Sequence, residues 1–171
     1  MAVLLGRTTA GTVADGIPSS DAAAWRFTAV ASGDLGRIHF EPKVVNAGLT
    51  SVELGVYTHS GALPAALLGS ALATAFTGTA DFYADLASVV AIVSGTDYWL
   101  AIQPEGENFD WQGTSGANYN QRTGISALPA SWTTASDGGS WNNLAIIWGE
   151  TAPLAAPILI ANTLKPMTKR N

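Results

Sequence analysis

The sequence predicts an all-β protein, an antiparallel β-sandwich of jelly-roll type with seven to nine strands and an extended C-terminal arm. Two observations lead to this fold class. Eighteen Gly and eight Pro, together with many Ser and Thr, interrupt the chain about every eight to twelve residues. Between these breaks, several segments alternate apolar and polar residues with a period of two, and no long segment has helical periodicity.

Three segments of the first half alternate in this way: 25–30, 37–41 and 52–56. Successive side chains of a strand point to opposite faces, so Ile38 and Phe40 are expected in the core. Their neighbours Arg37, His39 and Glu41 are expected to face solvent. The third segment places Val52, Leu54 and Val56 on one face, with Glu53 and Tyr57 on the other.

The remaining segments give less uniform predictions. The near-continuous apolar runs 98–102 and 144–148 predict central strands buried on both faces. Residues 82–93 predict a longer, mixed strand, whereas the Ala-rich residues 62–75 fit either a short helix or a strand. Residues 105–139 predict long loops or a loose hairpin, with a turn at 137–139 before the last strand.

Composition excludes several functional classes. The net charge is −5, but three of the eight basic residues lie in the last seven positions, so residues 1–164 carry 5 − 13 = −8. Such a body repels phosphate backbones and anionic lipid, which disfavours nucleic-acid and membrane partners. The absence of cysteine excludes disulfides and thiolate chemistry. The first residues lack the basic region of a signal peptide, and no cofactor is predicted.

Candidate catalytic residues are few. His39 is expected on a solvated strand face and His59 in a turn, so neither predicts a catalytic base. Glu105, Glu107 and Asp110 lie beside aromatic residues, an arrangement that fits a glycosidase pair next to a sugar platform. Their surroundings are also typical of an exposed turn. The sequence therefore predicts a protein that is not an enzyme, with glycan cleavage as a remote alternative.

Four aromatic residues in polar stretches of sequence permit two interpretations. They are Trp111, Tyr119, Trp132 and Trp141. Exposed aromatic faces stack on sugars or anchor protein interfaces, which predicts a carbohydrate-binding module or a partner contact. The alternative is that these rings close the ends of the sandwich core. The sequence leaves both readings open.

The last part of the chain differs from the rest, which divides it into a sandwich domain at 1–149 and an arm at 150–171. The arm is apolar and ends in basic residues, and the contacts expected of it come from Leu154, Ile158, Leu159, Ile160, Leu164, Lys165, Lys169 and Arg170. Its three prolines, at positions 153, 157 and 166, favour an extended backbone. An apolar, extended segment of charge opposite to the body predicts an interaction arm and an oligomer.

Several segments taken together resemble a jelly-roll β-sandwich domain of structural proteins of tailed phages, which also occurs in secreted bacterial proteins. The similarity spans residues 4–103 and rests on 6–11, 25–28, 36–38, 52–64, 67–69 and 94–102. Residues 6–11 resemble the G-x-T-x-x-G start of the family, and residues 94–102 its G-T-x-Y-W-L strand. Residues 104–171 match no pattern of the family.

The resemblance implies a virion structural protein without catalytic activity, either a head decoration (cement) protein or a fibre or adaptor component. It also implies a homotrimer, because such virion proteins usually occupy three-fold or quasi-three-fold positions. The implied partners are other copies of the chain and the major capsid protein or another virion protein, with a host surface glycan as a further partner. The implied location is the particle surface, after synthesis in the host cytoplasm.

Overall fold

The computed structural model describes residues 1–9, 11, 13–76, 79–115, 119–132 and 143–151. In this part of the chain all regular secondary structure is β-strand. This confirms the predicted fold class. The strands are β1 (Val3–Gly6), β2 (Val13–Ile17), β3 (Ala22–Thr28), β4 (Gly33–Phe40), β5 (Pro42–Val44), β6 (Ser51–Ser60), β7 (Leu63–Ala73), β8 (Phe82–Ile92), β9 (Asp97–Glu105), β10 (Phe109–Ser115), β11 (Tyr119–Arg122), β12 (Asn143–Ala145) and β13 (Ile147–Thr151). The described residues contain no helix long and apolar enough to cross a membrane.

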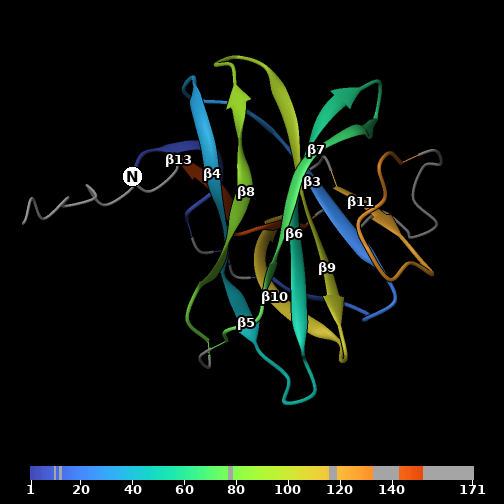
Figure 1. The fold of residues 1–171 in the computed structure, drawn as a ribbon. Helices are drawn as coiled ribbons and strands as arrows, with labels where there is room; N and C mark the ends of the chain where they lie inside the picture. The colour runs from blue at the N-terminus through green and yellow to red at the C-terminus, as the bar shows by residue number, and fades with distance from the viewer. Residues whose placement is uncertain (10, 12, 77–78, 116–118, 133–142, 152–171) are drawn as a thin grey trace, which may run out of the picture.

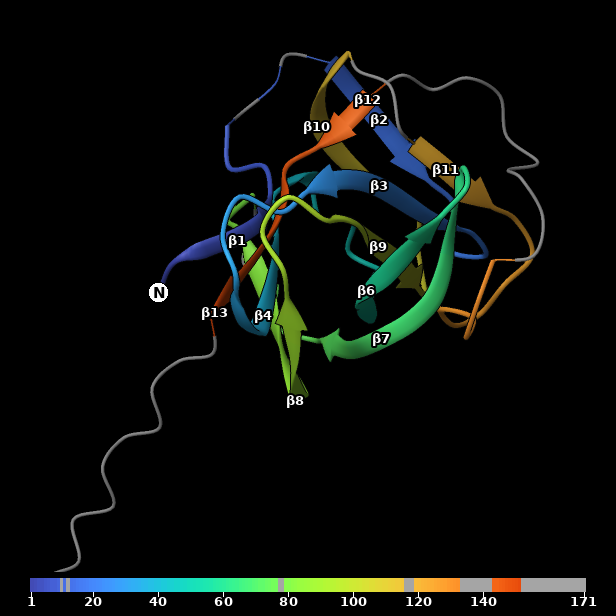
Figure 2. The ribbon, with the colours of Figure 1, turned by 90° about the horizontal axis from the view of Figure 1, so that it is seen from above.

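Two antiparallel sheets form the sandwich (Figure 1). One has the order β1-β13-β4-β8 and the other the order β11-β3-β9-β6-β7. A smaller sheet, in which β10 pairs with β12, β2 and β5, closes one flank between them. On the opposite flank β7 and β8, the last strands of the two main sheets, face each other (Figure 2).

The main core lies between the two large sheets, where the alternating strands send their apolar side chains inward. Ile38 and Phe40 are fully buried there, as are Val52, Leu54 and Val56, which confirms the predicted inward faces. Burial of such side chains stabilises a fold by about 1.5–3 kcal/mol each before ordering costs. The alternation of apolar residues therefore determines which face of each sheet is covered.

A second apolar cluster lies on the outer face of the five-stranded sheet. Ala22, Ala24 and Ala101 leave room on that face, and the large rings of Tyr57 and Trp99 lie beside them. Leu128 and Trp132, from the segment after β11, cover the cluster. The Tyr57 hydroxyl donates a hydrogen bond to the Pro129 carbonyl at 2.8 Å, which fastens this segment to β6.

Several elements differ from the sequence-based expectation. For residues 62–75 the strand alternative is confirmed, since Leu63–Ala73 form β7, whereas residues 105–139 contain two strands, β10 and β11, where long loops or a loose hairpin were expected. The apolar run 144–148 is divided between β12 and β13, which belong to different sheets. The described residues form thirteen strands instead of seven to nine, because β1, β2, β5 and β12 are too short to show alternation. The expected turn at 137–139 lies outside the described residues.

Candidate functional site

The open flank between β7 and β8 is the candidate functional site. Within the described residues, β7 pairs only with β6 and β8 only with β4, so each strand is the last of its sheet. The first part of β7 is covered, because Leu67 donates its backbone N–H to Ala130 and Trp132 donates to Pro64. The later part of β7 has no such cover in the described residues, and an uncovered sheet edge is a template for pairing with another chain.

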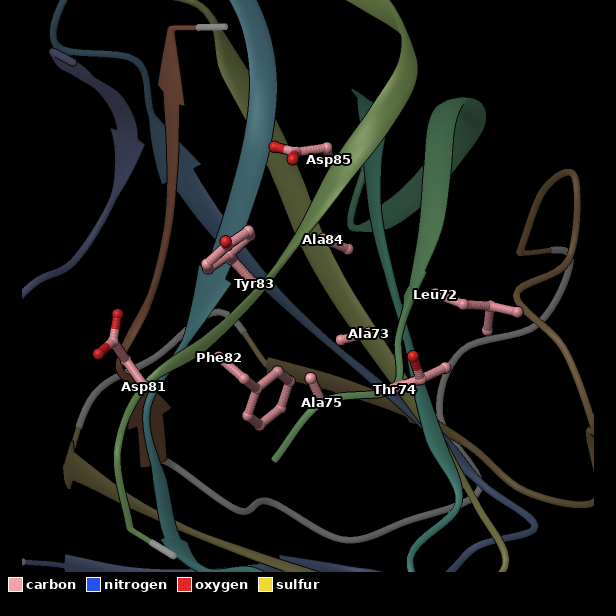
Figure 3. Close-up of a pocket in the computed structure, with 9 residues that line it drawn as sticks. All are labelled: Leu72, Ala73, Thr74, Ala75, Asp81, Phe82, Tyr83, Ala84 and Asp85. Carbon is pink, nitrogen blue, oxygen red and sulfur yellow. The ribbon is translucent and has the colours of Figure 1, made fainter. Parts of the chain in front are cut away.

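A pocket of about 420 Å³ opens where β7 ends and β8 begins (Figure 3). Its lining comes from the end of β7 and the residues after it, and from the start of β8: Leu72, Ala73, Thr74, Ala75, Asp81, Phe82, Tyr83, Ala84 and Asp85. Figure 3 shows Phe82 and Ala75 close together at its centre, with Asp81 on the other side of Phe82 from Thr74. The pocket therefore combines an apolar floor with a carboxylate at its margin.

Large apolar side chains project from this flank into solvent. Leu68 and Leu72 of β7 are 40% and 61% exposed, and Tyr83 and Val89 of β8 are 49% and 51% exposed. Four of the eight exposed large apolar residues of the described chain thus lie on these two strands. Exposed large apolar side chains on two neighbouring edge strands make this flank a candidate interaction surface.

Local irregularities of the two strands shape the flank. Between the pairs Leu35–Val90 and Arg37–Asp85, four residues of β8 (86–89) stand opposite one residue of β4. Such a bulge interrupts regular pairing and twists the edge. Gly69 of β7 faces the bulge, and a Cβ there would meet Val90 Cγ2 at 3.2 Å, so glycine allows the close approach of the strands. Regular pairing of β8 with β4 remains at residues 82–85, beside the pocket, and at residues 90–92, beyond the bulge.

His39 lies on the outer face of β4, as expected, but it is not solvated. Its ring stacks on Trp148 of β13 at 4.7 Å between centroids, and it is only 8% exposed. Its Nδ1 atom lies 3.2 Å from an oxygen of Asp81. Its Nε2 atom lies 3.3 Å from Glu150 without hydrogen-bond geometry. The prediction of a solvated His39 is wrong because neighbouring strands supply large side chains that cover the ring.

Arg37, the neighbour of His39 on the same face, is held by β8. Its guanidinium lies 3.8 Å from the centre of the Tyr83 ring and donates two hydrogen bonds to Asp85, at 2.6 and 2.9 Å. These bonds raise the pKa of Arg37 and lower the pKa of Asp85 from its ordinary value of 3.8. The pair fastens β8, and with it one wall of the pocket, to β4.

Replacement of Asp85 by asparagine should lower the free energy of unfolding by about 0.2–1 kcal/mol at neutral pH, the range for partly exposed ion pairs. A carboxylate whose pKa is lower in the folded state stabilises the fold above its ordinary pKa, and the contribution disappears as the pH falls through the folded value. Urea unfolding of the wild type and Asp85→Asn at pH 7 and near pH 2 measures this, with the exposed Asp34→Asn as control. An equal difference at both pH values would contradict the prediction.

The loop tryptophans proposed as glycan platforms lie in the apolar interior where the structure describes them. Trp111 of β10 is 0% exposed and packs edge-on against Trp25, with ring centroids 5.3 Å apart. Trp132 is 4% exposed and packs edge-on against Tyr57. Neither ring presents a face on which a sugar could stack, so the geometry favours the alternative in which they close the core. Their burial corrects the platform hypothesis for these two residues.

The other candidate contact residues divide into two groups. Tyr119 of β11 is partly buried against Trp25 and donates its hydroxyl to Gln121 at 2.9 Å. Trp141 lies outside the described residues, and so does the arm from residue 152 onward, including all eight of its proposed contact residues. Glu150 and Thr151, which the sequence analysis assigned to the arm, belong to β13.

The carboxylates considered for catalysis bind local groups. Glu105 accepts a hydrogen bond from Ser51 at 2.9 Å, and Glu107 accepts one from the backbone of Asn108. Asp110 lies on β10, paired with Gly16 of β2. No group of three or more His, Asp or Glu side chains within the described residues is arranged to hold a metal ion.

His59, expected in a turn, lies in β6 and is tied to two neighbouring strands. The Trp99 indole donates a hydrogen bond to its Nδ1 atom at 3.0 Å. Arg26 lies 3.4 Å from its Nε2 atom. The hairpin turn itself follows at Gly61, whose φ of +63° suits glycine.

Sequence reasoning missed the residues of the β7–β8 pocket. The available signal was in residues 82–93, where apolar side chains recur but lose the period of two near Val89. A loss of alternation within a strand indicates a bulge, and bulges are frequent at sheet edges. A comparison of the chain with models of known protein families and with curated proteins found no match.

Proposed function

We propose that this protein is a non-enzymatic structural component of a tailed-phage particle, either a head decoration protein or a fibre or adaptor component. The observation that carries the proposal is the flank of β7 and β8, whose strands carry four large apolar side chains at least 40% exposed. A rigid sandwich with an open, apolar strand edge is suited to joining protein subunits. The all-β architecture also agrees with what the resemblance implies.

In this proposal the protein binds other copies of itself, as a homotrimer, and the major capsid protein or another particle protein. Closed rings arise when a surface of one copy meets a different surface of the next copy and the rotation closes. The charge contrast between the body, at −8 over residues 1–164, and the three basic residues that follow favours such contacts between unlike surfaces.

The proposal predicts that the protein is found in particles. Tailed particles purified by density gradient from a lysate of the source should contain the chain in a fixed ratio to the major capsid protein, measured by quantitative mass spectrometry. Immunogold labelling of the same particles distinguishes head from tail. Recovery of the chain only in the particle-free fraction, with particles that lack it, would contradict the proposal.

A further inference from the structure

We propose that the edge of β8 beside the pocket binds the segment 158–165 of a neighbouring copy, which adds to the four-stranded sheet as a fifth strand. The inference rests on the proposed assembly function and identifies the two surfaces through which copies join. Three observations support it: the edge of β8 has no paired strand among the described residues, the pocket beside this edge has a mixed apolar and acidic lining, and β13 ends at Thr151 away from the pocket.

The receiving edge is regular only over a short stretch. Strand β8 pairs residue by residue with β4 from Phe82 to Asp85, and the bulge at residues 86–89 ends this regularity. A strand added beside Tyr83 to Asp85 would extend the sheet over the pocket. Its inward side chains would lie above the floor formed by Ala73 and Ala84 and beside the exposed Leu72. The bulge limits the length of the added strand, as protected sheet edges generally do.

The proposed ligand has the composition of a strand. Residues 158–165 read Ile-Leu-Ile-Ala-Asn-Thr-Leu-Lys, without glycine or proline, and Pro157 and Pro166 bound them on both sides. β-branched and aliphatic residues favour strands, and proline ends pairing because it lacks the N–H donor. Alternation places Ile158, Ile160 and Leu164 on one face together with Asn162, which suits a pocket lined by both apolar and polar side chains.

Charge favours the antiparallel direction of this added strand. Around the start of β8, Asp81, Asp85 and Glu150 contribute −3 and Arg37 contributes +1, a net charge of −2 apart from His39. In the antiparallel direction the end of the segment, at Lys165, meets this acidic region, and Lys169 and Arg170 follow. Opposite charges at the two surfaces guide the approach and fix the direction of pairing.

We assign the donor segment to a neighbouring copy because β13 ends at the opposite end of the sheet from the pocket. Strand β13 runs in the same direction as β8, and its last residue, Thr151, stands opposite Leu35, which pairs with Val90. To reach its own β8 edge, the chain would have to reverse and cross two strands within residues 152–157. Pro153 and Pro157 restrict themselves and the residues before them to extended conformations, which opposes a reversal.

The length of the segment is sufficient for a contact in trans. Twenty residues follow Thr151, and an extended chain of that length reaches about 65 Å. A segment that leaves one body and pairs with the edge of the next makes a head-to-tail contact, which closes into a ring when the rotation allows it. The homotrimer of the proposed function is one such ring.

Cysteine cross-linking in the full-length protein tests the contact directly, because the chain has no cysteine of its own. Two variants are mixed under mild oxidation: Thr74→Cys, at the exposed margin of the pocket, and Ala161→Cys in the segment. We expect a mixed disulfide dimer at least about tenfold faster than with the matched control Ser60→Cys, because docking raises the local thiol concentration. Ser60 is exposed and lies at the other end of the β6–β7 hairpin.

Further variants test the charge contact, the receiving edge and the identity of the donor copy. Lys165→Glu with Lys169→Glu should slow cross-linking to Thr74→Cys severalfold, and Asp81→Lys should restore it. Equal rates for Thr74→Cys and Ser60→Cys would overturn the proposed edge. A chain carrying both Thr74→Cys and Ala161→Cys that forms only an internal disulfide would overturn the neighbouring copy as donor. Circular dichroism of each variant confirms that the strands are retained.

These measurements use purified protein in solution, and the particle experiment uses the lysate, so the two proposals fail separately. A chain absent from particles that still cross-links would contradict the particle location and leave the edge contact in place. A chain present in particles without cross-linking would contradict the edge contact alone.

Discussion

Replacement of Trp111 by alanine is expected to lower the free energy of unfolding by about 3–5 kcal/mol, the range for removal of a fully buried tryptophan. Trp111 is 0% exposed and joins the small sheet to the main core through its edge-on contact with Trp25. The substitution leaves a cavity that the surrounding strands fill only in part. Chemical unfolding followed by circular dichroism measures the loss.

The matched control is Trp111→Phe, which keeps an aromatic ring against Trp25. The buried Trp111 Nε1 atom has no hydrogen-bond partner among the described residues, so phenylalanine removes an unpaired donor while it loses part of the volume. We expect this variant to lose clearly less stability than alanine. Alanine and phenylalanine variants that both retain wild-type stability, with glycan binding lost in a glycan array, would instead support a sugar platform.

The fold class could be predicted because alternation depends only on neighbouring residues within one strand. Ile38 and Phe40 face the core, as do Val52 and Leu54, because a one-residue shift would move every apolar side chain to the wrong face. The run 98–102 was correctly assigned to a central strand: β9 pairs with β3 on one side and β6 on the other. These features were available from the sequence because apolar burial determines them.

Features that depend on partners from distant strands could not be predicted. Strand β10 alternates only at Phe109 and Trp111 before it continues through Gly113 and polar residues, and nothing in this segment indicates that it pairs with three other strands. His39 has polar neighbours in sequence, and its burial comes from Trp148 and Asp81, which are more than forty residues away. The sequence of a single strand does not contain this information.

The candidate site could not be predicted because it depends on the order of the strands in the two sheets. Leu72 and Tyr83 have the composition of ordinary strand residues, and nothing local indicates that β7 and β8 are the last strands of their sheets. Their exposure follows from strand order, which alternation does not determine. The arm stays a prediction from proline spacing and charge, since residues 152–171 lie outside the described residues, and the edge proposed to bind it follows from strand order.

Replacement of Gly6 by alanine is expected to destabilise the protein by about 2–5 kcal/mol. About 1–2 kcal/mol comes from the backbone conformation, because φ is +99° and side chains oppose such values. About 1–3 kcal/mol comes from overpacking, because a Cβ at this position would lie 2.3 Å from the Ile147 carbonyl oxygen and 2.6 Å from Trp148 Cα. Both contacts are with backbone atoms of β13, which cannot rotate away as a side chain would.

The Gly6→Ala substitution should also weaken the pairing of β1, the edge strand, with β13. The Ile147 carbonyl accepts a hydrogen bond from Arg7 at 2.8 Å, so displacement of this oxygen also weakens the pairing of β1 with β13. The control is Gly61→Ala, where φ is +63° but a Cβ would meet nothing within 4 Å, so only the conformational cost remains. Thermal unfolding should show a clearly larger loss for Gly6→Ala than for Gly61→Ala. Equal losses would mean that β13 moves aside without cost and that the first glycine of the G-x-T-x-x-G segment is required for its backbone conformation alone.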